Sequence, residues 1–355
     1  MKKEQEFARN LIDFIDKSLS QFHATINVED ILIKEGFKKL NFQDKWELEK
    51  EGKYYTIKNN SAIIAFRIGK GEIEENGFKL IGAHTDAPGF RIKPNPEMTV
   101  EGKYLKLNTE VYGGPILNTW FDRPLSMAGR VSIKTENPLK PKELLMDIEK
   151  PIMIIPNLAI HMNKGMNDGL KINPQTETLP LLATINDKFE KDNFLLKLIA
   201  ENLNVNVEDI LDFELYLYAV EKGSLVGLNE EFISIGKLDD LAMVHAGLYG
   251  LIDSKVGDAT NVLICFDNEE VGSRTKQGAA SPMLRTVLER ISIAMGKDRE
   301  DYYRALSNSF LISSDQAHAL HPNYTEKQDP TSRPVVNGQS RRKSRRSGCP
   351  PSSCR

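Results

Sequence analysis

Cysteine is scarce in this chain, with three residues in 355. Cys265 lies in an apolar run that predicts a strand, and only Cys349 and Cys354 stand where they could pair. Small secreted domains depend on several disulfides, so this usage excludes a disulfide framework.

Long apolar runs are absent as well. No stretch approaches the roughly 20 apolar residues that a membrane-spanning helix needs. The first 22 residues spread charges among apolar positions at helical spacing, which predicts an amphipathic helix and excludes the uninterrupted apolar core of a signal peptide. We therefore expect a cytoplasmic protein without a membrane partner.

Neither sign of charge is in excess. The chain has 47 basic and 50 acidic residues, a net charge of −3, so it has no overall electrostatic reason to bind nucleic acid. Its length allows two domains, and 40% hydrophobic residues with 8% aromatic ones can fill their cores. These values predict a soluble globular protein.

The pattern along the chain predicts an α/β sheet domain that an insertion divides in two. Helices come first, and the α/β rhythm returns from Ser234 onward. Between about Pro94 and Glu221, short β-like runs alternate with Gly and Pro. The elements we predict are strands Lys53–Lys58, Ala62–Gly69, Phe78–His84, Lys103–Asn108, Gly129–Ile133, Ile152–Ile155, Asn261–Phe266 and Phe310–Ser314, and helices Asn193–Asn202, Asp239–Ile252 and Pro282–Met295.

Three segments follow from this pattern. Residues 1–93 and 233–338 form the α/β domain, residues 94–232 the inserted β-rich domain, and residues 339–355 a basic tail. The tail has five basic residues within Arg341–Arg346 and no apolar periodicity, so it cannot form part of a core. A nucleic-acid or targeting patch is its functional interpretation. We favour a solvated tail or one translated out of frame, because it interrupts a domain that looks unfinished.

Two segments place polar residues directly after apolar strands. Ile-Gly-Ala-His84-Thr-Asp86 offers an imidazole to a metal, with a carboxylate two residues on to fix its tautomer. In Cys-Phe-Asp-Asn-Glu269-Glu270-Val-Gly, one glutamate can bind metal while the other accepts a proton from water. Open α/β sheets build their sites at strand exits, so the pair predicts a metallohydrolase.

A site for two metal ions also needs a carboxylate that bridges them. Asp239, at the start of a predicted helix, can supply it, although its neighbour Asp240 fits the spacing equally well. Asp315, after the last predicted strand, completes the first ion's ligands. Each residue alone has a simpler explanation, since Asp239 could merely cap its helix. Taken together at strand ends, they favour a metal site.

Six motifs in order make the chain similar to a known family, the M18 metalloaminopeptidases, which include aspartyl aminopeptidase. The motifs are Gly-Ala-His84-Thr-Asp86-Ala-Pro-Gly, Tyr-Gly-Gly-Pro-Ile-Leu-Asn-Thr-Trp-Phe-Asp-Arg-Pro-Leu, Ile-Pro-Asn-Leu-Ala-Ile-His161, Leu-Asp239, Asn-Glu269-Glu270-Val-Gly-Ser and Ser-Asp315-Gln-Ala-His318-Ala-Leu-His321-Pro-Asn-Tyr. The resemblance implies a zinc-peptidase-like mixed sheet flanked by helices, an inserted dimerisation domain, and dimers assembled into dodecamers.

The resemblance also implies a metal set. His84, Asp239 and Asp315 would hold one ion, and Asp239 with Glu270 a second. Zn²⁺ is the expected metal, two per subunit in the family, with Co²⁺ or Mn²⁺ as alternatives. The substrates would be peptides with a free N-terminus.

The remaining roles follow from the same motifs. Glu269 would be the general base that activates a bridging water, and Asp86 would lie behind His84. His161 would reach the active site of a neighbouring subunit, although without the family it is an ordinary polar residue of the second domain. Apart from the resemblance, His318 and His321 follow Asp315 closely enough to lie near the metal or in the substrate pocket, and we expect neither to be a ligand.

The chain departs from the family at its end. The resemblance implies one more metal ligand, a downstream histidine, but no histidine follows His321. The resemblance stops near Asn337, where the tail begins. We therefore expect one firmly held ion, impaired activity, and a chain truncated or frameshifted after about residue 338.

Three questions stay open at this point. The N-terminal residue removed is either Asp or Glu, which needs a cationic pocket, or a neutral residue; Arg91, Lys93 and Arg123 lie near the motifs. A related dinuclear carboxypeptidase or acylase shares the metal logic. A non-catalytic assembly subunit is the alternative from a different class.

Overall fold

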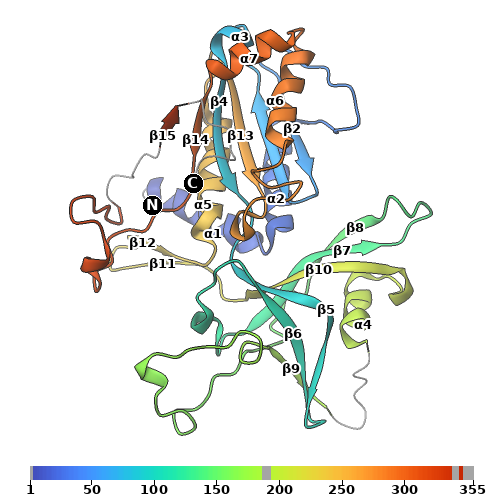
Figure 1. The fold of residues 1–355 in the computed structure, drawn as a ribbon, viewed down its shortest axis with the longest axis vertical. Helices are drawn as coiled ribbons and strands as arrows, with labels where there is room; N and C mark the ends of the chain where they lie inside the picture. Colours follow the sequence, from blue (N-terminus) through green and yellow to red (C-terminus); the bar gives the residue numbers. More distant parts are fainter. Residues whose placement is uncertain (1–2, 186–192, 338–343, 347–355) are drawn as a thin grey trace. The chain divides into compact units, whose positions relative to one another are not determined.

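The computed structural model describes residues 3–185, 193–337 and 344–346, and it divides into two units (Figure 1). The first unit comprises residues 1–86 and 223–355, the second residues 87–222. Both boundaries lie earlier than those we predicted. Strand β5 starts at Gly89 and pairs inside the second unit, whereas Gly223 donates its N–H to Asp16 of the first.

A seven-stranded mixed sheet forms the centre of the first unit. Strands β13, β4 and β14 are parallel neighbours, and Phe266 at the end of β13 is in register with His84 at the end of β4. Their carboxyl ends therefore share one edge of the sheet. In spatial order the strands are β1 Lys38–Lys39, β2 Lys53–Lys58, β3 Ala62–Arg67, β13 Thr260–Phe266, β4 Phe78–His84, β14 Phe310–Ser313 and β15 Ser344–Arg346.

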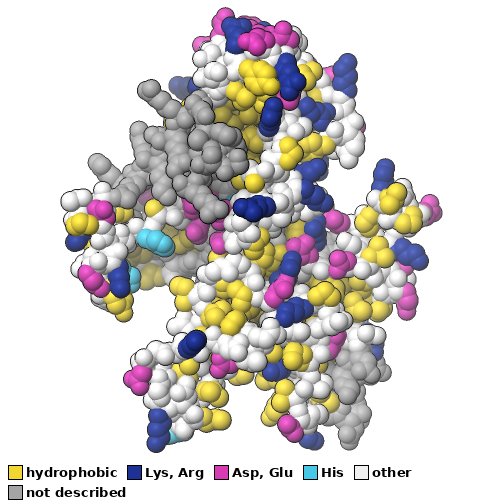
Figure 2. All heavy atoms as spheres, viewed as in Figure 1, with side chains coloured by type: hydrophobic (Ala, Val, Ile, Leu, Met, Phe, Trp, Pro, Cys, Tyr) yellow, Lys and Arg dark blue, Asp and Glu magenta, His cyan; other side chains and the backbone are white. Residues whose placement is uncertain are grey.

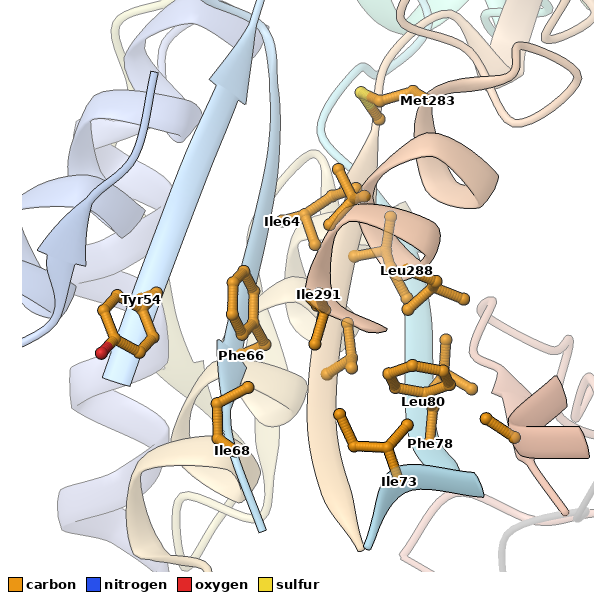
Figure 3. Close-up of a cluster of buried hydrophobic side chains, with 14 of the residues drawn as sticks. Tyr54, Ile64, Phe66, Ile68, Ile73, Phe78, Leu80, Met283, Leu288 and Ile291 are labelled. Carbon is orange, nitrogen blue, oxygen red and sulfur yellow. The ribbon is translucent and has the colours of Figure 1, made fainter. Parts of the chain in front are cut away.

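Helices cover both faces of this sheet, so its central strands are apolar on both sides. On β3, Ile64 and Phe66 pack on the face shown in Figure 3, while Ile63 and Ala65 pack on the other. Burying each larger side chain contributes about 1.5–3 kcal/mol. The first face packs against α3 Ile73–Asn76, α6 Met283–Ala294 and α7 Arg299–Ser307, the second against α1 Lys3–Lys17, α2 Gln21–Lys34 and α5 Leu238–Asp253.

The second unit is a six-stranded antiparallel sheet with its own core. Its order is β8 Lys142–Asp147, β7 Leu125–Ile133, β10 Ile210–Ala219, β5 Gly89–Val100, β6 Tyr104–Tyr112 and β9 Leu181–Thr184, with α4 Phe194–Leu203 packed against it. The mixed α/β sheet and the separate β-rich sheet confirm the predicted fold class. The smaller elements are β11 Ser224–Val226, β12 Phe232–Ser234, and 3₁₀ turns Leu117–Trp120, Met166–Asp168, Val207–Asp209, Glu269–Val271 and Thr325–Lys327.

One predicted strand is wrong. Residues 152–155 make only isolated bridges, in which Met153, Ile154 and Ile155 pair with three different partners. No continuous ladder can form along such a segment. Ser344–Arg346 of the predicted tail pairs with β14, and the rest of residues 339–355, including both remaining cysteines, lies outside the described residues.

Two further expectations concern membrane-spanning helices and the distribution of surface charge. Among the helices of the described residues, none has the length and apolar content needed to cross a bilayer. Acidic and basic side chains are mixed on both units in Figure 2, as the near balance of charge predicts.

The N-terminal helix α1 is held against α5 around a buried histidine. His245 lies 2.7 Å from Asn10 through Nε2, and the rings of Phe7, Phe14 and Tyr249 surround its imidazole. Burial lowers the pKa of His245 to about 4, because the apolar surroundings disfavour the imidazolium.

We expect this histidine to make stability depend on pH. Between about pH 4 and 6.5 the unfolded chain binds a proton that the folded chain does not, so stability falls as pH falls through this window. Relative to pH 7.5, the loss at pH 5 amounts to about 2 kcal/mol. His245→Gln should lose this component, measured as urea unfolding at both pH values. The exposed His318→Gln is the matched control, and equal pH dependence in all three proteins contradicts the assignment.

Candidate metal centre

The polar residues that follow β4, β13 and β14 meet at the shared edge of the sheet in the first unit. β4 ends at His84, the turn with Glu269 and Glu270 follows β13, and Asp315 follows β14. Helix α5 adds Asp239 and completes the cluster. The parallel register explains why residues far apart in sequence converge here.

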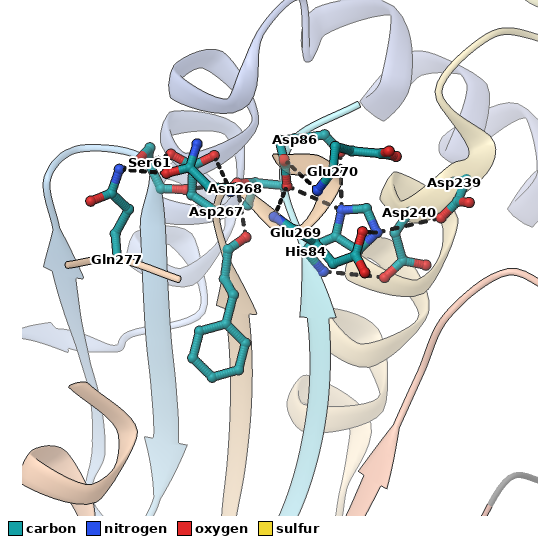
Figure 4. Close-up of polar contacts among 12 residues, drawn as sticks. Ser61, His84, Asp86, Asp239, Asp240, Asp267, Asn268, Glu269, Glu270 and Gln277 are labelled. Carbon is teal, nitrogen blue, oxygen red and sulfur yellow. Dashed lines mark hydrogen bonds and ion pairs between the residues drawn. The ribbon is translucent and has the colours of Figure 1, made fainter. Parts of the chain in front are cut away.

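His84 is the centre of the cluster (Figure 4). Its ring is buried; Nδ1 lies 3.2 Å from Asp86 Oδ1, and Nε2 lies 3.4 Å from Asp239 Oδ1 and 4.0 Å from Glu269 Oε2. When Nδ1 donates to Asp86, the lone pair of Nε2 faces Asp239 and Glu269. This is the tautomer that a metal ligand requires.

Asp86 orients more than the imidazole. Its carboxylate is fully buried and accepts the backbone N–H groups of Glu269 and Glu270, each at 3.1 Å. One side chain thus ties the end of β4 to the turn after β13. The sequence predicted the contact with His84 but gave no sign of the two backbone contacts.

The two adjacent aspartates of α5 differ in environment. Asp240 is buried, and its Oδ2 accepts the backbone N–H of His84 at 3.1 Å. Asp239 leaves 52% of its side chain exposed and faces Nε2 of His84. Asp239 is therefore the more exposed of the two carboxylates, whereas Asp240 is tied to the backbone of β4.

Within the described part of the chain, two groups of side chains have the composition of a metal site. His84 groups with Asp239, Asp240 and Asp315, and also with Glu269 and Glu270, with all ligand atoms of a group within 4.8 Å of one another. Oδ1 of Asp240 is buried without a hydrogen-bond partner. A cation next to it would supply the missing interaction, so the residues fit a metal.

The protonation of the cluster shows the same need for positive charge. Burial raises the pKa of Asp240 to about 8 and that of Glu270 to about 7. Burial, followed by the charge of Asp315, also raises the pKa of Asp239. Burial opposes charge on His84, but its hydrogen bond and ion pair with Asp86 raise its pKa to about 9. Crowded carboxylates hold protons that a divalent cation would replace.

The other predicted site residues lie outside these groups. His318 is exposed and belongs to neither group. Nδ1 of His321 accepts the N–H of Asn323. His161 is exposed and belongs to the second unit.

Sequence reasoning missed a second layer behind the glutamates. Asp267, Asn268, Thr275 and Gln277 form a hydrogen-bonded group next to the turn. Polar residues in a glycine-containing loop give no pattern that would identify them.

A histidine and several carboxylates at the carboxyl edge of a mixed sheet define a metal-dependent hydrolase. Residues 14–341 match the family described as aminopeptidase I zinc metalloprotease (M18). The chain belongs to this family, which confirms the resemblance read from its motifs and makes it a zinc metalloaminopeptidase.

Individual proteins are also similar to this chain in sequence and in fold. A probable M18 family aminopeptidase 2 of Clostridium novyi is 62% identical over 337 residues, covering 95% of this chain and 78% of the relative. The structure described as the Ape4 and Nbr1 complex has a TM-score of 0.89 at 35% identity, covering 94% of this chain and 67% of that one. The S. cerevisiae mApe1 dodecamer has a TM-score of 0.81 at 29% identity, covering 94% and 77%.

We expect Asp86→Asn to weaken metal binding about 10- to 100-fold. The amide keeps the volume but cannot accept from both backbone N–H groups and His84 at once. Competition with a chromogenic zinc chelator measures the affinity. Asp253→Asn, an exposed change at the end of α5, is the control. Equal zinc affinities in the two variants would show that Asp86 does not support metal binding.

Proposed function

We propose that this aminopeptidase removes the N-terminal residue of peptides at the centre around His84. His84, Asp239 and Asp315 would hold one zinc ion, and Asp239 with Glu270 a second. The observation that supports this most strongly is the orientation of His84, with Nδ1 on Asp86 and Nε2 facing Asp239. Asp86 would fix the imidazole and the turn that carries both glutamates.

Zinc bound there would polarise the scissile carbonyl and make water more acidic. Glu269 would accept the proton of the attacking water and transfer it to the departing amine. Its carboxylate lies 4.0 Å from Nε2 of His84 and leaves 49% of the side chain exposed, so substrate and water can reach it. Burial also raises its pKa, which suits a group that takes up and releases a proton.

The preference for Asp, Glu or a neutral residue depends on a cation in the pocket. Arg91 pairs with Glu110, and Arg123 pairs with Glu221. The positive charges of these two arginines are thus already neutralised by glutamates. A pocket for an acidic residue would need another cation, and we favour removal of neutral residues.

Assembly is part of the proposal. One solved relative is described as a dodecamer. We propose a homo-oligomer built from dimers through the second unit, with His161 reaching the metal centre of the neighbouring subunit. His318 would line the substrate pocket near Asp315.

Glu269→Gln should lower turnover by about 10²- to 10⁴-fold while zinc content stays at the wild-type value. The amide cannot accept the proton, but the proposed ligands remain. Turnover and zinc per subunit are measured on the same samples, with exposed Glu300→Gln as control. Retained turnover in Glu269→Gln would refute its role as base.

Peptides with free and acetylated N-termini separate an aminopeptidase from a carboxypeptidase or acylase. We expect hydrolysis of the free peptides only, and faster release from leucyl than from aspartyl anilide. Zinc content per subunit is recorded alongside. Cleavage of acetylated peptides would contradict the proposed substrate class, and an assembled, zinc-loaded protein without turnover would indicate an assembly subunit.

A further inference from the structure

The turn that carries the two glutamates has an unfavourable backbone. Asn268 and Ser273 adopt left-handed conformations with φ of 61° and 60°, and Gly272 lies between them with φ of 100°. Left-handed φ costs a non-glycine residue roughly 1 kcal/mol. Neighbouring groups must therefore hold this turn in place.

Two side chains hydrogen-bond to Asn268 at the start of this turn. Gln277 donates from Nε2 to Oδ1 of Asn268 at 2.8 Å, and Thr275 donates from Oγ1 to the same oxygen, also at 2.8 Å. The Gln277 amide also donates to Oδ2 of Asp267 at 3.4 Å. We call Thr275 and Gln277 the clamp.

The backbone closes the same loop. Asp267 donates its N–H to the carbonyl of Gln277 at 3.2 Å, and Ser273 donates to the carbonyl of Asn268 at 2.7 Å. The clamp therefore fixes the Asn268 side chain, while Ser273 holds its carbonyl and the Gln277 carbonyl holds the N–H of the preceding Asp267. Asn268 directly precedes Glu269, so its conformation sets where the Glu269 carboxylate points.

The clamp is separate from the metal ligands. Its residues are a threonine and a glutamine, whereas the two metal-capable groups consist of His, Asp and Glu side chains. Figure 4 shows Gln277 and Asn268 on the β13 side of the turn, away from Asp239 and Asp240. Within the described residues, Oε1 of Gln277 is buried and has no hydrogen-bond partner. The side chain therefore contacts the turn through its amide nitrogen, Nε2.

We propose that Gln277 and Thr275 are positioning residues for catalysis, which act through Asn268 to aim Glu269 at the attacking water. This rests on the proposed role of Glu269 as general base. The clamp fixes Asn268 at the start of the turn, and Asp86 fixes the next two residues through the N–H groups of Glu269 and Glu270. Loss of either would let the base move relative to His84.

Gln277→Met keeps the length of the side chain and removes the donors, and Thr275→Val keeps the shape and removes the hydroxyl. We expect both to lower kcat about 10- to 100-fold with KM within about twofold, because a small displacement of a catalytic group has effects of this size. Thr275→Ser restores the donor and should return kcat to near the wild-type value. Exposed Gln43→Met is the matched control.

Two further measurements distinguish positioning from general damage. In the Glu269→Gln background, Gln277→Met should cause little additional loss, since its effect passes through the missing carboxylate. Unfolding midpoints should stay close to wild type for Thr275→Val. Wild-type kcat in Gln277→Met, or an equal loss of kcat and stability in Thr275→Ser and Thr275→Val, would overturn the proposal.

Failure of the proposed function gives a different result. If the wild-type chain does not turn over, the clamp is tested through zinc affinity, because Glu270 lies on the same turn. A weaker affinity in Gln277→Met and not in Gln43→Met would then support the clamp without supporting the base. Unchanged affinity in both would count against the clamp.

Discussion

The buried carboxylate of Asp86 is the interaction on which the rest of the centre depends. A carboxylate without solvent is costly unless hydrogen bonds compensate it. Here the donors are the imidazole of His84 and the N–H groups of Glu269 and Glu270. These donors come from two strand ends, so the charge that stabilises the turn also orients His84, the proposed metal ligand.

The sheet makes this arrangement possible. Phe266 and His84 are in register, so the residues that follow β13 arrive beside the end of β4. Apolar packing on both faces of β3, β4 and β13 fixes these strands and leaves the edge free to hold polar groups. The packing thereby compensates for an unfavourable cluster of carboxylates and a left-handed turn at Asn268.

The sequence predicted those parts of the structure that follow from local pattern. Strands Lys53–Lys58 and Phe78–His84 have the predicted bounds, because turn residues border each apolar run. Polar residues just after such strands indicated the cluster around His84. By contrast, the choice between Asp239 and Asp240 depends on the direction of each carboxylate, which spacing does not encode. The clamp of Thr275 and Gln277 was not predicted for a similar reason, because its hydrogen bonds depend on the conformation of the loop.

The cluster also limits how zinc can be shared among the described residues. His84 belongs to both metal-capable groups, but its Nδ1 contacts Asp86, so a single lone pair at Nε2 is left for an ion. An ion bound at Nε2 would have an imidazole and carboxylates as ligands, a combination that zinc prefers. A second ion would have carboxylate ligands only. Oxygen-only ligand sets suit harder ions such as Mn²⁺ and lack the imidazole that suits zinc. The two ion positions proposed among these residues would therefore be unequal, and the one next to His84, Asp239 and Asp315 should fill first.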